Sequence, residues 1–215
     1  MINLKKRIYS SQALKERIGK QVVLAGWAQD IKLLGKLAFV ILRDRKGDIQ
    51  LTFLKSFPEL KNLTRESVIA VQGKIVKGKS KKYAKEVVVS SMEVLSRAQT
   101  PIPIEFKDTI KTSLTKRLDN RHLDLRNKKV RAIFNVQSEI CKAFRDFFRN
   151  KGFIEVWPPE IIGAAAEGGT ELFHAVYFNK KVYLAQSPQL YKQMIIMSDI
   201  EKVFSIAPIF RAEPH

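Results

Sequence analysis

The stretch Gln186-Ser-Pro-Gln-Leu-Tyr-Lys-Gln193 combines the signals of a helix start with polar groups that a purely structural helix does not need. Ser187 is a favourable N-cap residue, and Pro188 suits the first helical position, where a missing N–H costs nothing. Apolar residues then recur at helical spacing, whereas Gln189 and Lys192 share another face. The stretch therefore predicts a helix that begins at Pro188 and has one face available for binding.

A second informative segment, Val203-Phe-Ser-Ile-Ala-Pro-Ile-Phe210, is an apolar run of the length of a strand. Arg211 and Glu213 follow it two residues apart, so both side chains would leave the same face of an extended strand. An arginine at the end of a sheet is suited to phosphate. We therefore expect a strand that leads into an anion site.

The composition is that of a globular protein with a large excess of positive charge. Hydrophobic residues make up 45% of the 215 positions, and 39 Lys and Arg against 21 Asp and Glu give a net charge of +18. Such a charge attracts polyanions, which favours nucleic acid as the partner; a basic protein without such a ligand is the alternative. No apolar run reaches the length of a membrane span, so no membrane partner is expected.

The single cysteine, Cys141, lies in an apolar helical pattern and cannot form an intramolecular disulfide. This fits a reducing compartment, and the N-terminal segment lacks the apolar core of a signal peptide, so we expect the cytoplasm. The three histidines are too scattered for a metal site, and none is predicted.

The first half of the chain consists of short β-type runs separated by turn signals. Five runs are expected to be strands, at 22–27, 37–42, 49–53, 67–76 and 87–95, with a loop or short helix near 57–63. Five strands with an insertion between the third and the fourth are the plan of an OB-fold, a small barrel whose sheet face binds oligonucleotides.

An aromatic residue and a run of lysines are the candidates for nucleic-acid contact on this barrel, because OB-folds stack bases on aromatic rings within a positive groove. Phe39 on the second predicted strand is one candidate, and a core position is its alternative. The lysine run is more often a solvated hairpin tip than a binding site. It comprises Lys77, Lys79, Lys81, Lys82 and Lys85.

The second half of the chain follows a proline-containing connector, 96–104, which places a domain boundary near residue 100. The segment 114–126 is charged and irregular, and its alternating Arg and Asp residues are expected to form ion pairs or to contact phosphate; a solvated loop is the alternative. A long amphipathic helix is predicted from Val130 to Arg149, with Gly152 at its C′ position.

These segments together resemble the class II aminoacyl-tRNA synthetases, and among them the aspartate–tRNA ligases of the archaeal and eukaryotic type. The resemblance is carried by QSPQLYKQM with IAPIFRAE, by RLDNR and LDLR, and by the helix and strand that end at Pro159. It implies an all-β OB-fold barrel followed by an α+β domain with the antiparallel sheet and flanking helices of the class II catalytic domain. The expected parts are an anticodon-binding domain at 1–100, a hinge at 101–129, and motif 1, the flipping loop and the start of motif 2 at 130–215.

The resemblance also implies the reaction, which is ATP-dependent activation of aspartate as aspartyl-adenylate, assisted by Mg²⁺, followed by transfer to tRNA. Arg211 would be the catalytic arginine that binds the α-phosphate of ATP, and Glu213 would contact the adenine. Neither step requires a protein nucleophile, because positioning and neutralisation of phosphate charge supply the catalysis.

The amino-acid pocket implied by the resemblance contains residues from two segments. Glu167, in the glycine-containing stretch predicted to be the flipping loop, would bind the α-ammonium, and Lys192 would bind the side-chain carboxylate. Ser187 and Gln189 would complete the pocket. A neutral amide does not call for a lysine, so Lys192 favours aspartate over asparagine.

On the barrel, the resemblance assigns Phe39 to stack on an anticodon base and Gln50 and Glu86 to hydrogen-bond with the anticodon. The expected partners are L-aspartate, tRNA for aspartate, with tRNA for asparagine left open, and a second copy of the chain. The homodimer would form through the phenylalanine-rich face of the helix of motif 1.

The resemblance stops inside motif 2 at residue 215, so motif 3 and the Mg²⁺ ligands are expected outside these residues. The chain alone is therefore expected to be inactive. Two alternatives stay open: a non-catalytic tRNA-binding and dimerisation module, and an asparagine–tRNA ligase.

Overall fold

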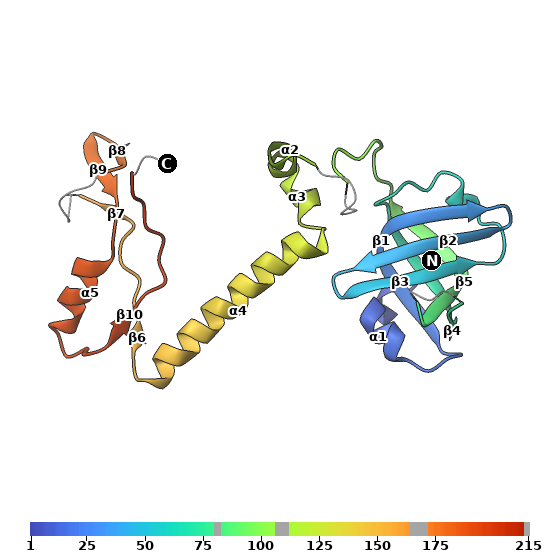
Figure 1. Cartoon of the computed structure of the whole chain (residues 1–215), viewed down its shortest axis with the longest axis horizontal. Helices are drawn as coiled ribbons and strands as arrows, with labels where there is room; N and C mark the ends of the chain where they lie inside the picture. Colours follow the sequence, from blue (N-terminus) through green and yellow to red (C-terminus); the bar gives the residue numbers. More distant parts are fainter. Residues whose placement is uncertain (80–82, 106–111, 164–171, 213–215) are drawn as a thin grey trace. The chain divides into compact units, whose positions relative to one another are not determined.

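The computed structural model describes residues 1–79, 83–105, 112–163 and 172–212 (Figure 1). The chain divides into two compact units, Met1–Pro103 and Ile104–His215. The division into three parts expected from the sequence stays a prediction.

The first unit is a closed five-stranded barrel in the order β1-β2-β3-β5-β4, as the sequence predicted. All neighbouring strands are antiparallel except β3 and β5, which are parallel. The elements of this unit are η1 (Leu4–Lys6), α1 (Ser10–Lys15), β1 (Gln21–Leu34), β2 (Leu37–Asp44), β3 (Gly47–Phe53), η2 (Pro58–Leu60), β4 (Val68–Lys77) and β5 (Lys85–Ser96).

Strand β1 is about twice as long as the predicted run 22–27, because it pairs with two different neighbours. Residues 21–27 pair with β4, residues 27–34 pair with β2, and a bulge between Ala28 and Asp30 separates the two parts. A bulge bends a strand and increases its twist, which a small closed barrel needs. Gly26 permits close approach at this bend, because a Cβ there would lie 2.3 Å from the carbonyl oxygen of Arg43.

Strict alternation divides β2 and β3 into an inner and an outer face. The inner residues close the core together with residues of the other strands; those that are fully buried include Leu24, Val40, Leu42, Ile49, Leu51, Phe53, Ile69 and Val71. The outer residues Phe39, Ile41 and Gln50 are half-buried. This alternation presents Phe39 on the outside of the barrel and not in its core.

Three members of the lysine run, Lys77, Lys79 and Lys85, lie in the part of the chain that the structure describes. Lys77 and Lys79 are exposed, whereas Lys81 and Lys82 lie outside the described residues. Lys85 donates hydrogen bonds from Nζ to the carbonyl oxygens of Leu14 (2.9 Å) and Glu16 (2.6 Å), at the C-terminal end of α1. A cation is favoured there by the helix dipole and by the unsatisfied carbonyls, so Lys85 has a structural partner.

The second unit combines helices with short strands. Strands β6 and β10 form a parallel pair, and β7, β9 and β8 form an antiparallel sheet in that order. Its elements are α2 (Leu114–Asp119), α3 (Arg121–Asp124), α4 (Lys128–Asn150), β6 (Ile154–Glu155), β7 (Ile161–Ile162), β8 (His174–Tyr177), β9 (Lys180–Leu184), α5 (Gln189–Ile196) and β10 (Val203–Phe204). None of the helices in the described ranges is long and apolar enough to cross a membrane.

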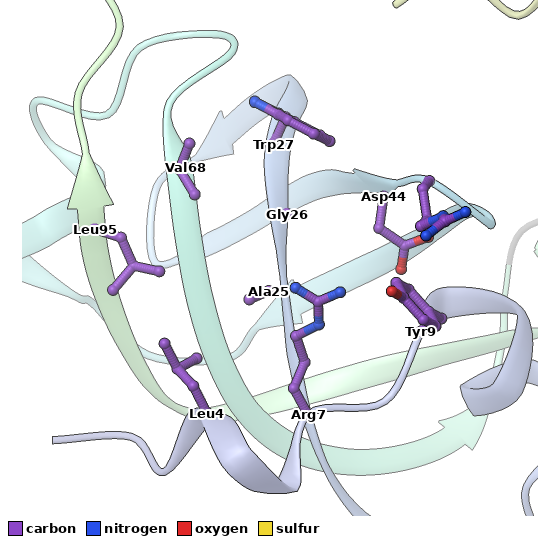
Figure 2. A pocket seen from close by; sticks show the side chains of 10 residues that line it. Leu4, Arg7, Tyr9, Ala25, Gly26, Trp27, Asp44, Val68 and Leu95 are labelled. Carbon is purple, nitrogen blue, oxygen red and sulfur yellow. The ribbon is translucent and has the colours of Figure 1, made fainter.

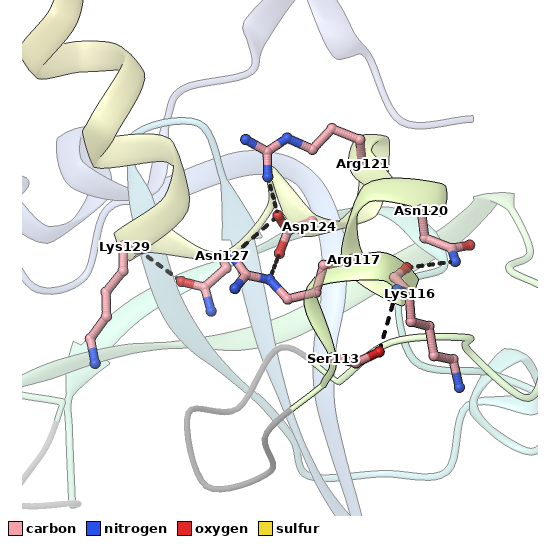
Figure 3. A network of polar contacts seen from close by, with 8 residues as sticks. All are labelled: Ser113, Lys116, Arg117, Asn120, Arg121, Asp124, Asn127 and Lys129. Atoms are coloured by element: carbon pink, nitrogen blue, oxygen red, sulfur yellow. Dashed lines mark hydrogen bonds and ion pairs between the residues drawn. The ribbon is translucent and has the colours of Figure 1, made fainter. Parts of the chain in front are cut away.

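The segment 114–126 is not irregular as expected, because it forms the short helices α2 and α3. The predicted ion pairs are present, and Figure 3 shows both arginines directed at Asp124. Arg117 Nε lies 2.8 Å from Asp124 Oδ1, and Arg121 Nη1 lies 2.6 Å from Oδ2. The carboxylate is buried, so these contacts hold the turn between the two helices.

Helix α4 extends the predicted helix by two residues at its start and by one at its end. The Asn127 side chain caps its first turn by accepting a hydrogen bond from Lys129 N at 2.8 Å. At its end Gly152 has φ +81° and donates to Arg149 O, while Phe153 N donates to Phe148 O. This is a Schellman motif with glycine at C′, as predicted.

Glu155 on β6 joins this strand to the last turns of α4. Arg145 Nε lies 2.8 Å from Oε1 of Glu155, and Arg149 Nη2 lies 3.0 Å from Oε2. The hydrogen bond from Arg145, assisted by Arg149, holds the pKa of the Glu155 carboxyl below its usual range.

Candidate functional site

The outer face of the barrel brings together the three residues assigned to the anticodon. In the register of the sheet, Ile41 is opposite Gln50, and Gln50 is opposite Glu86, so a single row crosses β2, β3 and β5. Phe39 lies two residues from Ile41 on the same face of β2. The structure therefore places Phe39, Gln50 and Glu86 on one continuous surface.

A shallow cavity of about 280 Å³ lies on this surface beside Phe39. Its other lining residues include Gln50 from β3 and the residues Asp30, Ile31 and Lys32 of β1. The sequence reasoning missed Asp30 and Lys32, because it ended the first strand at residue 27. The polar–apolar–polar alternation of Asp30, Ile31 and Lys32 could have indicated that the strand continues to these residues.

Gln50 is held in one orientation by Glu86. Gln50 Nε2 donates a hydrogen bond of 2.5 Å to Glu86 Oε2, and Glu86 is only 5% exposed. With its amide N–H₂ directed at Glu86, Gln50 presents Oε1 as an acceptor for a ligand. Glu86 is therefore a positioning partner of Gln50 in the structure.

A buried tyrosine holds the strand β3 close to this surface. Tyr83 donates from its hydroxyl to Asp48 Oδ2 at 3.1 Å. Burial, followed by the negative charge of Asp48, raises the pKa of Tyr83 above its usual range. The hydroxyl consequently stays protonated and serves as a permanent donor.

The second group of candidate residues surrounds the start of α5. The helix begins at Gln189, one residue later than predicted, with Pro188 as the N-cap residue. Ser187 still supplies the capping bond, because its Oγ accepts from Gln189 N at 3.1 Å. Lys192 is half-buried on the first turn, where its backbone N–H donates to Pro188 O at 3.1 Å.

Backbone hydrogen bonds bring the two informative segments side by side. Ala185 N donates to Glu160 O at 2.8 Å, and Phe210 N donates to Ala185 O at 3.0 Å. Gln186, the next residue, is buried. The chain immediately before Arg211 therefore runs beside the chain that leads into Ser187, Gln189 and Lys192.

The predicted strand 203–210 is wrong beyond its first two residues. Strand β10 contains only Val203 and Phe204, which pair with β6. Val156 N still donates to Phe204 O, but the partner chain then reaches Pro158 and Pro159, which have no N–H to donate. Arg211 is thus exposed in an irregular segment and is not on a strand face.

Two of the predicted site residues, Glu167 and Glu213, lie outside the described residues. Within the described ranges, no group of three or more His, Cys, Asp or Glu side chains is arranged to hold a metal ion.

Comparison with known families matches both units of the chain. Residues 22–95 match the OB-fold nucleic acid binding domain, and residues 113–215 match the tRNA synthetases class II (D, K and N). An aspartate–tRNA(Asp) ligase of Pyrococcus horikoshii is 47% identical over 96% of this chain and 49% of its own length. An aspartate–tRNA(Asp/Asn) ligase of Methanococcus vannielii is 44% identical over the same shares.

Two solved structures are similar to this chain. An asparaginyl-tRNA synthetase from Pyrococcus horikoshii, complexed with asparaginyl-adenylate, has a TM-score of 0.86 and 35% identity, covering 99% of this chain and 49% of that one. A putative aspartyl-tRNA synthetase from Leishmania major has a TM-score of 0.84 and 28% identity, covering 98% of this chain and 45% of that one. The chain spans about half the length of the curated relatives it matches.

Proposed function

The chain belongs to the class II tRNA synthetases (D, K and N), and we propose that it supplies the anticodon-binding domain and the first part of the catalytic domain of an aspartate–tRNA ligase. The observation that carries the proposal is the surface shared by Phe39, Gln50 and Glu86. A stacking ring and an oriented amide on an OB-fold barrel are suited to an unpaired base.

In the proposed complex, one anticodon base stacks on Phe39 and donates a hydrogen bond to Gln50 Oε1. Glu86 holds Gln50 in position through the bond from Nε2. The cavity beside Phe39 offers room for a base edge, and Lys32 at its rim adds positive charge for the phosphate backbone.

In the catalytic part, Lys192 binds the side-chain carboxylate of L-aspartate, with Ser187 and Gln189 beside it and Glu167 on the α-ammonium. Arg211 binds the α-phosphate of ATP and Glu213 contacts the adenine. The backbone hydrogen bond from Phe210 to Ala185 supports this arrangement, because it places the residue before Arg211 beside the chain that leads into Ser187 and Gln189. ATP would supply the adenylyl group with loss of pyrophosphate, and Mg²⁺ would neutralise phosphate charge, while the residues of this chain bind and orient the two substrates.

Aspartate is preferred to asparagine because an ammonium is a compact counter-charge for a carboxylate. The aspartate–tRNA ligases among the relatives support this choice, and the Asp/Asn ligases among them support tRNA for asparagine as a further substrate. Because the fold is also similar to that of an asparaginyl-tRNA synthetase, asparagine is the alternative amino-acid substrate.

A homodimer through α4 is part of the proposal. The apolar face of this helix is largely exposed, including Ile133, Ile140 and Phe147. An exposed apolar stripe of this length is typical of an interaction surface. The cytoplasm is the proposed compartment, and Cys141 carries no disulfide.

Aspartate-dependent ATP–pyrophosphate exchange tests the proposal. The assay uses the chain alone and the chain joined to the remaining half of a relative's catalytic domain. Exchange is expected only in the joined protein, with aspartate and not with asparagine. Exchange driven by asparagine would instead identify an asparagine–tRNA ligase.

The second candidate function is a tRNA-binding module without catalysis. The net charge of +18 and the complete barrel favour it, because both support RNA binding without any catalytic residue. Absence of exchange in both proteins, together with retained tRNA binding, would establish this candidate.

A further inference from the structure

A larger cavity, of about 460 Å³, lies on a different face of the barrel and shares no lining residue with the cavity beside Phe39. Figure 2 shows Trp27 at one end, the apolar side chains of Leu4, Val68 and Leu95 along one side, and Arg7 and Tyr9 along the other. Its volume is within the range of small-molecule sites. One nucleotide is a ligand of suitable size.

The N-terminal segment runs alongside β1 and contributes Leu4, Arg7 and Tyr9 to the lining of the cavity. Arg7 forms a parallel bridge with Val23, and Ile8 N donates to Val23 O at 3.0 Å. The next outward residue of β1 is Ala25, whose short side chain forms the floor, and the following one is Trp27. Because the short side chain of Ala25 lies between Val23 and the large side chain of Trp27, space is left above Ala25.

The two cations that line the cavity, Arg7 and Arg45, have no acidic partner in the described part of the chain. Arg7 lies over the ring of Tyr9, with Cζ 4.7 Å from the ring centroid, and this cation–π contact holds the guanidinium at the cavity. Arg45 is exposed at the turn between β2 and β3. Among the described residues, neither Arg7 nor Arg45 forms a salt bridge.

The one carboxylate of the lining, Asp44, is already saturated. It accepts hydrogen bonds from Ser10 N (2.6 Å) and Ser10 Oγ (2.9 Å), and from Lys46 N (2.7 Å) and Gly47 N (3.1 Å). It is also buried. Its charge is therefore spread over four donors, and the two arginines dominate the field at the cavity mouth.

Aromatic rings beside unpaired guanidinium groups are the chemistry that binds nucleotides, because the base stacks and the phosphate accepts from arginine. We propose that this cavity is a second nucleotide-binding site, which takes one nucleotide of a bound RNA outside the anticodon. Its base lies against Tyr9 or Trp27, and its phosphate lies between Arg7 and Arg45. The proposal rests on the proposed function in that tRNA is the RNA concerned.

The first test uses uridine 5′-monophosphate as the probe and the NMR amide signals of the whole chain as the readout. Signals of Tyr9, Ala25 and Trp27 are expected to shift on titration, and Arg7→Gln is expected to weaken this response about tenfold. Uridine and inorganic phosphate serve as controls. No shift at these residues, or an equal response to inorganic phosphate alone, would overturn the nucleotide assignment.

The second test compares two neighbouring variants in binding to full-length tRNA. Arg45→Gln is expected to weaken binding about tenfold. Lys46→Gln removes the same charge from an exposed position outside the cavity and is expected to have a much smaller effect. Equal losses of tRNA affinity in the two variants would mean that Arg45 contributes only non-specific charge, which would overturn the proposal.

These readouts separate the two proposals. A response at Tyr9, Ala25 and Trp27 without any effect of Phe39→Ala on tRNA binding would count against the anticodon surface and support the second site. A strong effect of Phe39→Ala with no response at the cavity would overturn the second site alone.

Discussion

Replacing Phe39 with alanine tests whether the outer face of the barrel stacks on a base. Phe39 is half-buried on the outer face of β2, whereas its neighbours in the chain, Ala38 and Val40, are buried in the core. Stacking of one base on an aromatic ring contributes about 1 to 3 kcal/mol, so the tRNA dissociation constant should rise by roughly 5- to 150-fold. Filter binding at constant salt measures this change.

The position of Phe39 also predicts how its loss differs from the loss of a core ring. Phe53 is fully buried, and Phe53→Ala should destabilise the barrel by about 3 to 5 kcal/mol, because it leaves a cavity. Phe39→Ala should change the urea midpoint far less, while Phe39→Tyr should retain most of the tRNA affinity. Unchanged tRNA affinity in Phe39→Ala, with a large loss of stability, would show that Phe39 is a core residue and would refute its proposed stacking on a tRNA base.

Three further predictions concern contacts elsewhere. Lys85→Met should lower the free energy of unfolding by about 0.5 to 1.5 kcal/mol in urea titrations, because two bonds to α1 carbonyls are lost, whereas exposed Lys79→Met should not. Since the folded pKa of Tyr83 is raised, its contribution to stability is complete below the unfolded pKa of about 10 and declines as pH rises above it. Urea titrations at several pH values should show this decline in the wild-type protein and not in Tyr83→Phe; parallel curves would argue against a pKa of Tyr83 raised by burial and by Asp48. Lys192→Ala in the joined protein should abolish aspartate-dependent exchange and leave tRNA binding intact, and unchanged aspartate kinetics would remove its assigned role.

The barrel and the long helix could be predicted from the sequence because local patterns determine them. The alternation of β2 and β3 separates core residues from the surface of Phe39 and Gln50. The end of α4 is fixed by the backbone requirement for a positive φ, which glycine meets at position 152. Both signals act within a few residues and need no knowledge of partners.

The features that could not be predicted depend on residues distant in sequence. The second half of β1 forms because β2 returns alongside it, and β10 ends early because its partner β6 runs into prolines. The role of Lys85 depends on α1, which lies about 70 positions earlier. The cavity at Arg7 requires the N-terminal segment to pair alongside β1, which no periodicity within that segment indicates.

The central claim is that the outer face of the barrel recognises the anticodon of tRNA. Binding of this chain to tRNA for aspartate, compared with the same tRNA carrying a substituted anticodon, tests it most directly. At constant salt, substitution should weaken binding about tenfold or more, through the lost contacts with Phe39 and Gln50. Equal affinity for the two tRNAs would contradict the claim, because charge alone would then explain the binding.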